Sequence, residues 1–415
     1  MPETTFPIEK VRNLFPALQI KDQEQVFPIY FDGPGGTQMA QPCLDRMTEY
    51  ITTGMANLHG TFPTSQRTDA LLLEAKTAVG DLLNCKAEEV AFGQNMTSLA
   101  FQVSNSLRSF LKEGDEIVVT QLDHRANVDP WLYLAKETGA VVKFIPVNKD
   151  DFTLDLTKLE EIITKRTKLV AVGLSSNLTG TVSNAKIIFQ KAREVDAFTI
   201  ADAVHAVPHF PVDFESLDCD ILFCSAYKFF GPHLGIAVIK ADLFNKLPVA
   251  KLKPAPNEIP YKLETGTQNH EAIAGLCGAI EFIAKLGSGG HRKQRLRTGM
   301  EFIKAYEEEL MKDLEGFLKN IPEVTLYRAP DKIEKTPTFA FRIKNIHSRK
   351  ATEFFAEKYN LCIGDGHFYA ATMAEIFPVM ATGGWIRIGF APYNTREEIE
   401  IFKKALKDLL FMNSK

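Results

Sequence analysis

The chain has 415 residues, with 48 lysines and arginines against 52 aspartates and glutamates, and 45% of its residues are apolar. A chain of this length and composition suggests two or three domains with substantial cores and excludes a disordered protein. The net charge of -4 provides no basic field for nucleic acid or anionic lipid. We therefore expect a small-molecule substrate, and neither nucleic acid nor a membrane as partner.

The sequence also argues against export and metal binding. No apolar run approaches the roughly 18 residues of a membrane span, and the segment MPETTFPIEKVRNLF lacks the basic-then-apolar order of a signal peptide. We therefore expect a cytosolic protein. No CxxC pair occurs, which predicts reduced thiols and neither a zinc ribbon nor another metal site. The six cysteines are Cys43, Cys85, Cys219, Cys224, Cys277 and Cys362.

Short apolar, β-rich runs alternate with helical patterns between residues 66 and 240. Continuous apolar strands separated by helices are typical of a parallel sheet covered on both faces. The predicted fold class is therefore α/β, with ligands outside the carboxyl ends of the strands. The predicted strands are EIVVT (116–120), VVKFIPV (141–147), KLVAVGL (168–174), AFTIAD (197–202), DILFCSA (220–226) and GIAVIK (235–240).

The pattern changes after Gly287. The Gly-rich and basic stretch GSGGHRKQR is followed by a helical pattern over 298–318, the strands VTLYR, TFAFRI and WIRIGF, and a helix over 395–410. Strands mixed with helices at this spacing predict a smaller α+β domain. We expect a large domain over 31–287, a small domain over 288–415, and a segment over 1–30 that packs on the small domain.

Two polar side chains follow predicted strands where a site is expected. Lys228 is flanked by Tyr227, Phe229 and Phe230. Burial there would produce the free amine that attacks a carbonyl carbon, although a loop lysine that extends past aromatic rings is the ordinary alternative. Asp202 could keep the ring nitrogen of pyridoxal phosphate protonated, although a helix cap is equally compatible. Together they favour a Schiff-base enzyme.

Three further segments could complete such a site. Met96, Thr97 and Ser98 begin an amphipathic helical pattern, where backbone N–H groups favour a phosphate or simply mark a helix cap. His124 follows the strand EIVVT and could lie flat on a cofactor ring or be structural. Asn177 follows KLVAVGLSS and precedes the turn sequence LTGTV.

A set of motifs in collinear order resembles the class V aminotransferase superfamily and, within it, the cysteine desulfurase-like proteins. The resemblance runs from about residue 30 to the end of the chain. It implies a fold type I enzyme with a mostly parallel seven-stranded sheet between helices, pyridoxal 5'-phosphate as cofactor, and a homodimer with shared active sites. The motifs are GPGGTQ (33–38), NMTSLAF (95–101), LDHRANVDPW (122–131), SSNLTGTV (175–182), ADAVHAVPH (201–209), SAYKFFGPHLG (225–235), ETGTQNHEAIAG (264–275) and RIGFAPYNTREEI (387–399).

The resemblance implies catalytic roles for individual residues. Lys228 matches the Schiff-base lysine, Asp202 the partner of the pyridine nitrogen, and His124 the ring stacked on the cofactor. His205 stands where many relatives have a glutamine that faces the phenolic oxygen. Asn177 matches the asparagine near that oxygen and the substrate carboxylate.

The resemblance also implies binding roles. Arg387 matches the arginine that holds the α-carboxylate, a role suited to a bidentate guanidinium. Gly35 in the GPGG turn and His59 in NLHGTFPTSQRTD are expected on the substrate side, although loop hydrogen bonds explain them equally well. The phosphate is expected near Met96, Thr97, Ser225 and Tyr227, with Thr267 contributed across the dimer interface.

One departure from the family bears on the reaction. Cysteine desulfurases carry a nucleophilic cysteine on a loop ahead of the carboxylate-binding arginine, and here its place falls near His367. Without that thiol, we expect chemistry at Cα and Cβ, in which Lys228 removes the Cα proton. Elimination of a β-substituent, as in a carbon-sulfur lyase, is favoured over transamination or epimerisation.

Other hypotheses remain open. Cys362 could carry a persulfide, although buried free cysteines usually behave as small hydrophobes. A nicotinamide-dependent dehydrogenase lacks support because no GxGxxG follows a predicted strand. An inactive sulfur-transfer scaffold is opposed by the presence of Lys228, Asp202 and Arg387 together.

Overall fold

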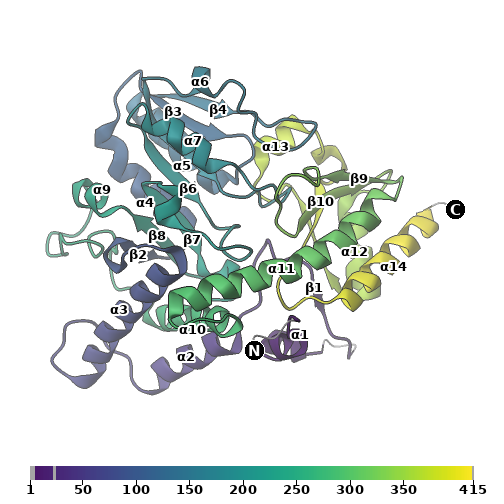
Figure 1. Ribbon diagram of the computed structural model, residues 1–415, viewed down its shortest axis with the longest axis horizontal. Coiled ribbons are helices and arrows are strands. Elements are labelled where there is room, and N and C mark those ends of the chain that lie inside the picture. The colour runs from purple at the N-terminus through teal and green to yellow at the C-terminus, as the bar shows by residue number, and fades with distance from the viewer. Residues whose placement is uncertain (1–4, 22–24, 414–415) are drawn as a thin grey trace.

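The computed structural model describes residues 5–21 and 25–413. Its centre is a seven-stranded sheet in the order β2-β8-β7-β6-β5-β3-β4 (Figure 1). Each strand predicted in this region is present, with bounds shifted by a residue or two, and the α/β class is confirmed. The strands are β2 (Val90–Gly93), β3 (Glu116–Thr120), β4 (Val141–Ile145), β5 (Thr167–Gly173), β6 (Phe198–Asp202), β7 (Ile221–Ser225) and β8 (Gly235–Ile239).

The sheet is parallel except at β8, which pairs antiparallel with both β7 and β2. The short connection over residues 226–234 explains this, because a parallel pair needs a crossover of about a dozen or more residues. The prediction of a parallel sheet therefore holds for the pairs from β7 to β4. The connection carries Lys228 at the carboxyl end of β7.

Side chains alternate between two buried layers. On β3, Ile117 and Val119 pack in one cluster with α4 (Met96–Leu107) and α5 (Asp129–Thr138). Val118 packs in the opposite cluster with α3 (Pro63–Leu83), α7 (Ala185–Arg193) and α10 (His270–Leu286). Because both faces are covered, the strands are apolar without a polar alternation.

A second sheet lies in the C-terminal part of the chain, with antiparallel strands in the order β12-β13-β10-β9. It includes the three strands predicted after Gly287. It packs against α12 (Ser348–Tyr359) and α14 (Arg396–Asn413). The strands are β9 (Val324–Tyr327), β10 (Thr338–Ile343), β12 (Gly364–Gly366) and β13 (Trp385–Gly389).

The helix α11 (Arg292–Lys319) runs along both parts (Figure 1). Near its start Arg292 pairs with Asp81 of α3 at 2.6 Å, and farther along Asp313 pairs with Lys403 of α14 at 2.7 Å. The long helix therefore links the two sheets. The remaining helices are α1 (Ile8–Arg12), α2 (Gln41–Thr52), α6 (Leu159–Ile162), α8 (Phe214–Leu217), α9 (Ala241–Lys246) and α13 (Ala371–Ile376).

The N-terminal segment contacts both parts of the molecule. Phe6 stacks on Tyr306 of α11 at 4.2 Å, whereas Phe15 meets Phe230 and Phe282 edge-on. The strand β1 (Ile29–Tyr30) pairs in parallel with β11 (Leu361–Cys362). The segment is thus not confined to the C-terminal part, and the three domain boundaries stay a prediction. In the described residues, we find no helix both long and apolar enough for a membrane crossing.

Candidate active site

A cavity of about 1200 Å³ lies beside the carboxyl ends of the central strands, between the two sheets. This volume exceeds the upper end of ordinary ligand pockets, about 1000 Å³, and leaves room for a cofactor with a small substrate. Eleven of the predicted site residues line it, from segments far apart in the sequence. They are Gly35, Met96, Thr97, His124, Asn177, Asp202, His205, Ser225, Tyr227, Lys228 and Arg387.

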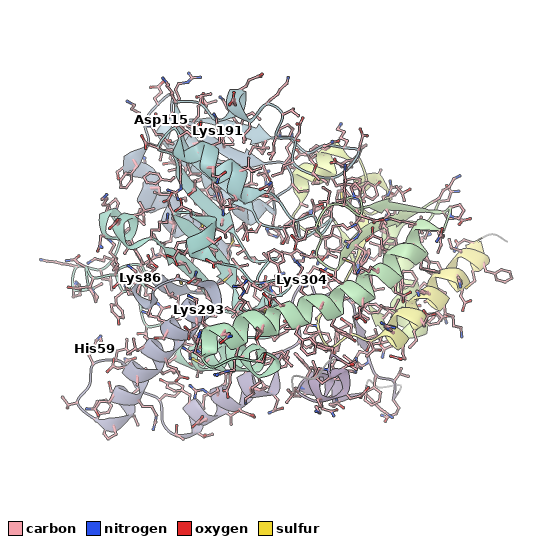
Figure 2. All side chains as sticks on the ribbon, in the orientation of Figure 1. His59, Lys86, Asp115, Lys191, Lys293 and Lys304 are labelled. Atoms are coloured by element: carbon pink, nitrogen blue, oxygen red, sulfur yellow. The ribbon has the colours of Figure 1, made fainter. Side chains whose placement is uncertain are left out.

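Two predicted site residues lie outside this cavity. The side chain of His59 is 75% exposed and lies 3.3 Å from Asp69, and Figure 2 shows it at the outer edge of the molecule beside α3. Thr267 lines a second cavity of about 430 Å³, together with Ser98 and His233. The expected role of Thr267 presupposes a second subunit, and the roles of both residues stay predictions.

The start of α4 is held against the end of β7. Asn95 caps the helix by accepting a hydrogen bond from Ser98 N at 2.9 Å, and Met96 N donates to Ser225 Oγ at 3.1 Å. Gly235 permits this close approach, because a Cβ there would lie 2.3 Å from the backbone of Asn95. Thr97 lies between Met96 and Ser98 and is exposed at the cavity. The helix dipole favours an anion there.

The Lys228 amine lies inside the cavity. Its Nζ donates to the carbonyl oxygens of Pro34 and Gly35, the latter at 3.0 Å. Burial and the nearby charge of Arg387 lower the pKa of Lys228 to about 7. A substantial fraction of the amine is therefore unprotonated near neutral pH, as a carbonyl-attacking nucleophile requires.

Two buried carboxyl groups lie in the same region. Asp202, at the end of β6, accepts a hydrogen bond from Val204 N at 2.9 Å, and burial raises its pKa to about 6. Asp123 accepts bonds from Asn127 Nδ2 at 2.8 Å and Gly173 N at 2.9 Å. Burial, with a smaller effect from the charge of Asp202, raises the pKa of Asp123 to about 7. A cationic heterocycle would be stabilised beside this pair.

Sequence reasoning missed Asp123. The available signal was its place directly before His124, three residues past the end of the buried strand β3. Nothing local indicated that its carboxyl group would be folded under the end of β5, where a Cβ on Gly173 would lie 2.8 Å from Asp123 Oδ1.

His124 is held as a neutral ring. Its Nδ1 accepts a hydrogen bond from Ala126 N at 3.0 Å, so the ring proton resides on Nε2. Burial, followed by the charge of Lys228, lowers the pKa of His124 to about 3. The ring lies 5.2 Å from that of Tyr369. A neutral, immobilised imidazole can stack on a planar cofactor.

His205 is tied to the C-terminal part of the chain. Its Nε2 lies 3.0 Å from both Thr336 Oγ1 and Thr338 Oγ1, and its ring is 5.1 Å from that of His209. Burial lowers the pKa of His205 well below its ordinary value. His209 Nδ1 in turn lies 2.8 Å from Glu307. The sequence carried no signal for these threonine contacts, which join residues more than a hundred positions apart.

Arg387, on β13, is buried and held on several sides. It donates to Asn177 O at 3.1 Å and to Asp32 Oδ1 at 3.0 Å, and its guanidinium lies 4.0 Å from the Phe368 ring centroid. Asn177 Nδ2 donates to Phe368 O at 2.9 Å. The predicted carboxylate-binding arginine therefore already has an acidic partner, Asp32, which the sequence did not indicate.

Three buried polar atoms along the cavity have no hydrogen-bond partner within the described part of the chain: Ser175 Oγ, Asn177 Oδ1 and Arg387 Nε. Buried polar groups are normally hydrogen-bonded, so these atoms indicate a place for a polar ligand. Together with the buried carboxyl pair and the start of α4, they fit pyridoxal phosphate and a bound carboxylate.

All six cysteines lie in the described part of the chain, and none lines the cavity. Cys362 is partly buried on β11, and burial, then the charge of Asp32, raises its pKa. His367, near the place of the family's nucleophile, does line the cavity. Its Nδ1 accepts a hydrogen bond from Tyr369 N at 3.0 Å.

An amine of lowered pKa, a buried acid beside it and a neutral imidazole, all at the carboxyl ends of a mostly parallel sheet, define the fold type I class of pyridoxal-phosphate enzymes.

Comparisons with known proteins agree with this class. The family model described as aminotransferase class-V matches residues 29–402. A cysteine desulfurase from Enterobacter sp. (strain 638) is 30% identical over 419 residues, covering 97% of this chain and 98% of that protein. One from Pectobacterium carotovorum subsp. carotovorum (strain PC1) is 29% identical, covering 95% and 96%.

Solved structures are similar along nearly the whole chain. The apo cysteine desulfurase from Thermococcus onnurineus NA1 has a TM-score of 0.87 at 26% identity, covering 99% of each chain. The cysteine desulfurase CsdA (S-sulfonic acid) from Escherichia coli has a TM-score of 0.84 at 25% identity, covering 99% of this chain and 100% of that one. The chain belongs to the aminotransferase class V family and is a cysteine desulfurase-like, pyridoxal-phosphate-dependent enzyme.

Proposed function

We propose that this enzyme is a lyase that eliminates a β-substituent, foremost a sulfur group, from a small amino acid. The observation that carries the proposal is a buried amine, Lys228 with its pKa lowered to about 7, in a cavity that none of the six cysteines lines. A desulfurase needs a thiol that can reach the sulfur of its substrate. An elimination needs a base at Cα and a group that stabilises the departing sulfur.

The geometry of the cavity supports the proposed cofactor-binding roles. Lys228 would hold the aldehyde carbon, Asp202 the ring nitrogen, and His124 one ring face, with the phosphate at the start of α4 beside Ser225. Pyridoxal phosphate would supply an electron sink for the electron pair left at the substrate's Cα. The enzyme would act as a cytosolic homodimer, with Thr267 contributed across the interface.

Lys228 and Arg387 would act on the substrate. Arg387 binds the α-carboxylate, which fixes the Cα–H bond relative to the lysine. Lys228 Nζ would take the Cα proton of the bound substrate. The lowered pKa supports this role because the amine must be unprotonated to act as a base near neutral pH.

His367 would stabilise the departing group with a hydrogen bond. Its Nδ1 is occupied by Tyr369 N, so the neutral ring carries its proton on Nε2, and the residue lines the cavity. As the bond from Cβ to sulfur breaks, the electron pair goes to sulfur, Nε2–H donates a hydrogen bond to the developing thiolate, and the thiolate takes its proton from water. The released 2-aminoacrylate hydrolyses to pyruvate and ammonia. Transamination and epimerisation share the first proton removal, but neither needs this donor.

Cofactor trapping and product analysis test the proposal. Borohydride reduction of the enzyme with pyridoxal phosphate should give a covalent adduct in the wild type and none in Lys228→Ala, as measured by mass spectrometry. Pyruvate and ammonia should then form from β-chloroalanine and from cysteine S-conjugates. A protein that captures no cofactor, or that yields alanine and sulfane sulfur from cysteine, would contradict the proposal.

A further inference from the structure

We propose that Asp32 is an internal carboxylate that occupies part of the binding fork of Arg387 and is displaced by the substrate's carboxylate. Asp32 would thereby determine how tightly, and with what selectivity, an amino acid binds. The inference rests on the proposed function for the identity of the substrate, although its central claim concerns carboxylate binding alone.

The hydrogen bonds of Arg387 leave one of its forks half filled. Nη1 donates to Asn177 O, and Nη2 donates to Asp32 Oδ1 at 3.0 Å. Nε is buried and has no partner among the described residues. Nε–H and one N–H of Nη2 point in the same direction, and a carboxylate binds best when each of its oxygens accepts one bond from such a fork. Asp32 satisfies only one of the two donors.

The two partners differ in their freedom to move. The side chain of Asp32 is 46% exposed, whereas that of Arg387 is 5% exposed. Arg387 is also fixed by Asn177 O and by the ring of Phe368. Asp32 can therefore turn into water with little loss of hydration, while Arg387 stays in place. A substrate carboxylate on Nε and Nη2 would complete the fork that Asp32 leaves incomplete.

The backbone turn after Asp32 holds the main chain of this residue in place and leaves room for its carboxylate beside Gly35. Gly35 N and Gly36 N donate to Asp32 O at 2.9 and 3.2 Å. A Cβ on Gly35 would lie 2.3 Å from Asp32 Oδ2, so any larger residue would push the carboxylate away. The same turn accepts the Lys228 amine through the carbonyls of Pro34 and Gly35. The turn therefore contacts both side chains, Lys228 and Arg387, that would act on an amino-acid substrate.

A preference among substrates follows. The displaced Asp32 stays close to the bound substrate, because its backbone is held in the turn. A second anionic group on the substrate would meet this carboxylate at short range and be repelled. The site is therefore expected to take amino acids with uncharged side chains and to discriminate against dicarboxylic ones.

The test measures the binding of propionate, an unreactive monocarboxylate, to the full-length protein with and without pyridoxal phosphate, by calorimetry. Asp32→Asn should tighten binding about tenfold, the scale of one charge-assisted hydrogen bond. Asp32→Glu, which keeps the charge, should not tighten it. The matched control Asp365→Asn removes another acid that lines the cavity, one that pairs with Arg349 rather than Arg387, and should leave the affinity unchanged.

Weaker or unchanged binding in Asp32→Asn would overturn the inference, because it would mean that Asp32 only orients Arg387. Asp32→Ser serves as a second variant if the asparagine variant does not fold, and the same tightening is expected. In the loaded enzyme, the discrimination against aspartate should also decrease in Asp32→Asn. The propionate measurement needs no turnover, so an absence of lyase activity would refute the proposed function and leave this result standing.

Discussion

Asn177 Nδ2 donates a hydrogen bond to the carbonyl oxygen of Phe368 at 2.9 Å. The bond joins the loop after β5 to the segment that carries His367, Phe368 and Tyr369 over the cavity. Phe368 and Tyr369 have φ angles of 51° and 57°. Such angles are unfavourable for residues other than glycine, so surrounding contacts are needed to hold the segment in this conformation.

Replacing Asn177 should loosen this segment. In Asn177→Ala we expect faster hydrogen exchange over residues 366–370 and a rise in KM of about tenfold, because a lost hydrogen bond to a strained segment costs on the order of 1 to 2 kcal/mol. Mass spectrometry measures the hydrogen exchange over residues 366–370. Thr97→Ala, on the far side of the cavity, is the control for exchange. Unaltered exchange over 366–370 in Asn177→Ala would mean that other contacts hold the segment.

The rate of cofactor capture should depend on pH through Lys228. With a pKa lowered to about 7, the amine is protonated and inert below that pH and free above it, so the rate should rise through about pH 7 and level off. Burial is the larger cause and the charge of Arg387 the second. Arg387→Gln should therefore raise the pKa and shift the midpoint upward. Stopped-flow absorbance after mixing with pyridoxal phosphate measures the rate of capture. A downward shift of the midpoint in Arg387→Gln would contradict the assignment of this titration to Lys228.

The loss of rate on replacing His367 should be larger for a more basic leaving group than for a less basic one. In His367→Phe, which has no N–H donor, elimination of an alkylthiol should slow by roughly 10- to 100-fold, the scale of one hydrogen bond to a charged group, about 1.5 to 3 kcal/mol. Elimination of chloride from β-chloroalanine should change little, because chloride is a weak base and departs with little stabilisation. Pyruvate formation from the two substrates gives the comparison. Equal losses for both would assign His367 a structural role, without bearing on whether the enzyme is a lyase.

A buried ion pair near the second cavity should carry a large part of the local stability. Lys76 Nζ lies 3.0 Å from Glu264 Oε2, with side-chain exposures of 3% and 4%, and Glu264 Oε1 accepts a bond from Phe92 N. Glu264→Gln leaves a buried ammonium unpaired and should lower the free energy of unfolding by about 3 to 5 kcal/mol.

An exposed pair provides the matched control for that change. Glu301→Gln breaks the exposed pair with Arg297 and should cost about 0 to 1 kcal/mol. Denaturant titration measures both variants. A similarly small loss for Glu264→Gln would show that Lys76 loses its proton at little cost once its partner is removed. Burial already lowers the pKa of Lys76, which acts in the same direction.

Some features of the site were accessible from local sequence. Asp202 closes one apolar run and Lys228 lies two residues after another, and the ends of parallel strands meet at one edge of a sheet, so their proximity to one site could be predicted. The capped start of α4 had a similarly local signal in Asn95 and the residues after it. The antiparallel direction of β8 was also implied by the short connection over 226–234, although the overall pattern indicated a parallel sheet.

The sequence by itself determined six of the seven strands of the central sheet and indicated Lys228 as the candidate reactive amine, because the apolar periodicity of a strand or helix is a property of neighbouring residues. Only the tertiary structure decided that Asp32 lies on Arg387, that Thr336 and Thr338 contact His205, and that Asp123 lies under Gly173. These contacts join segments tens to hundreds of residues apart. Their distances depend on how the two sheets pack, which no local pattern of side chains records.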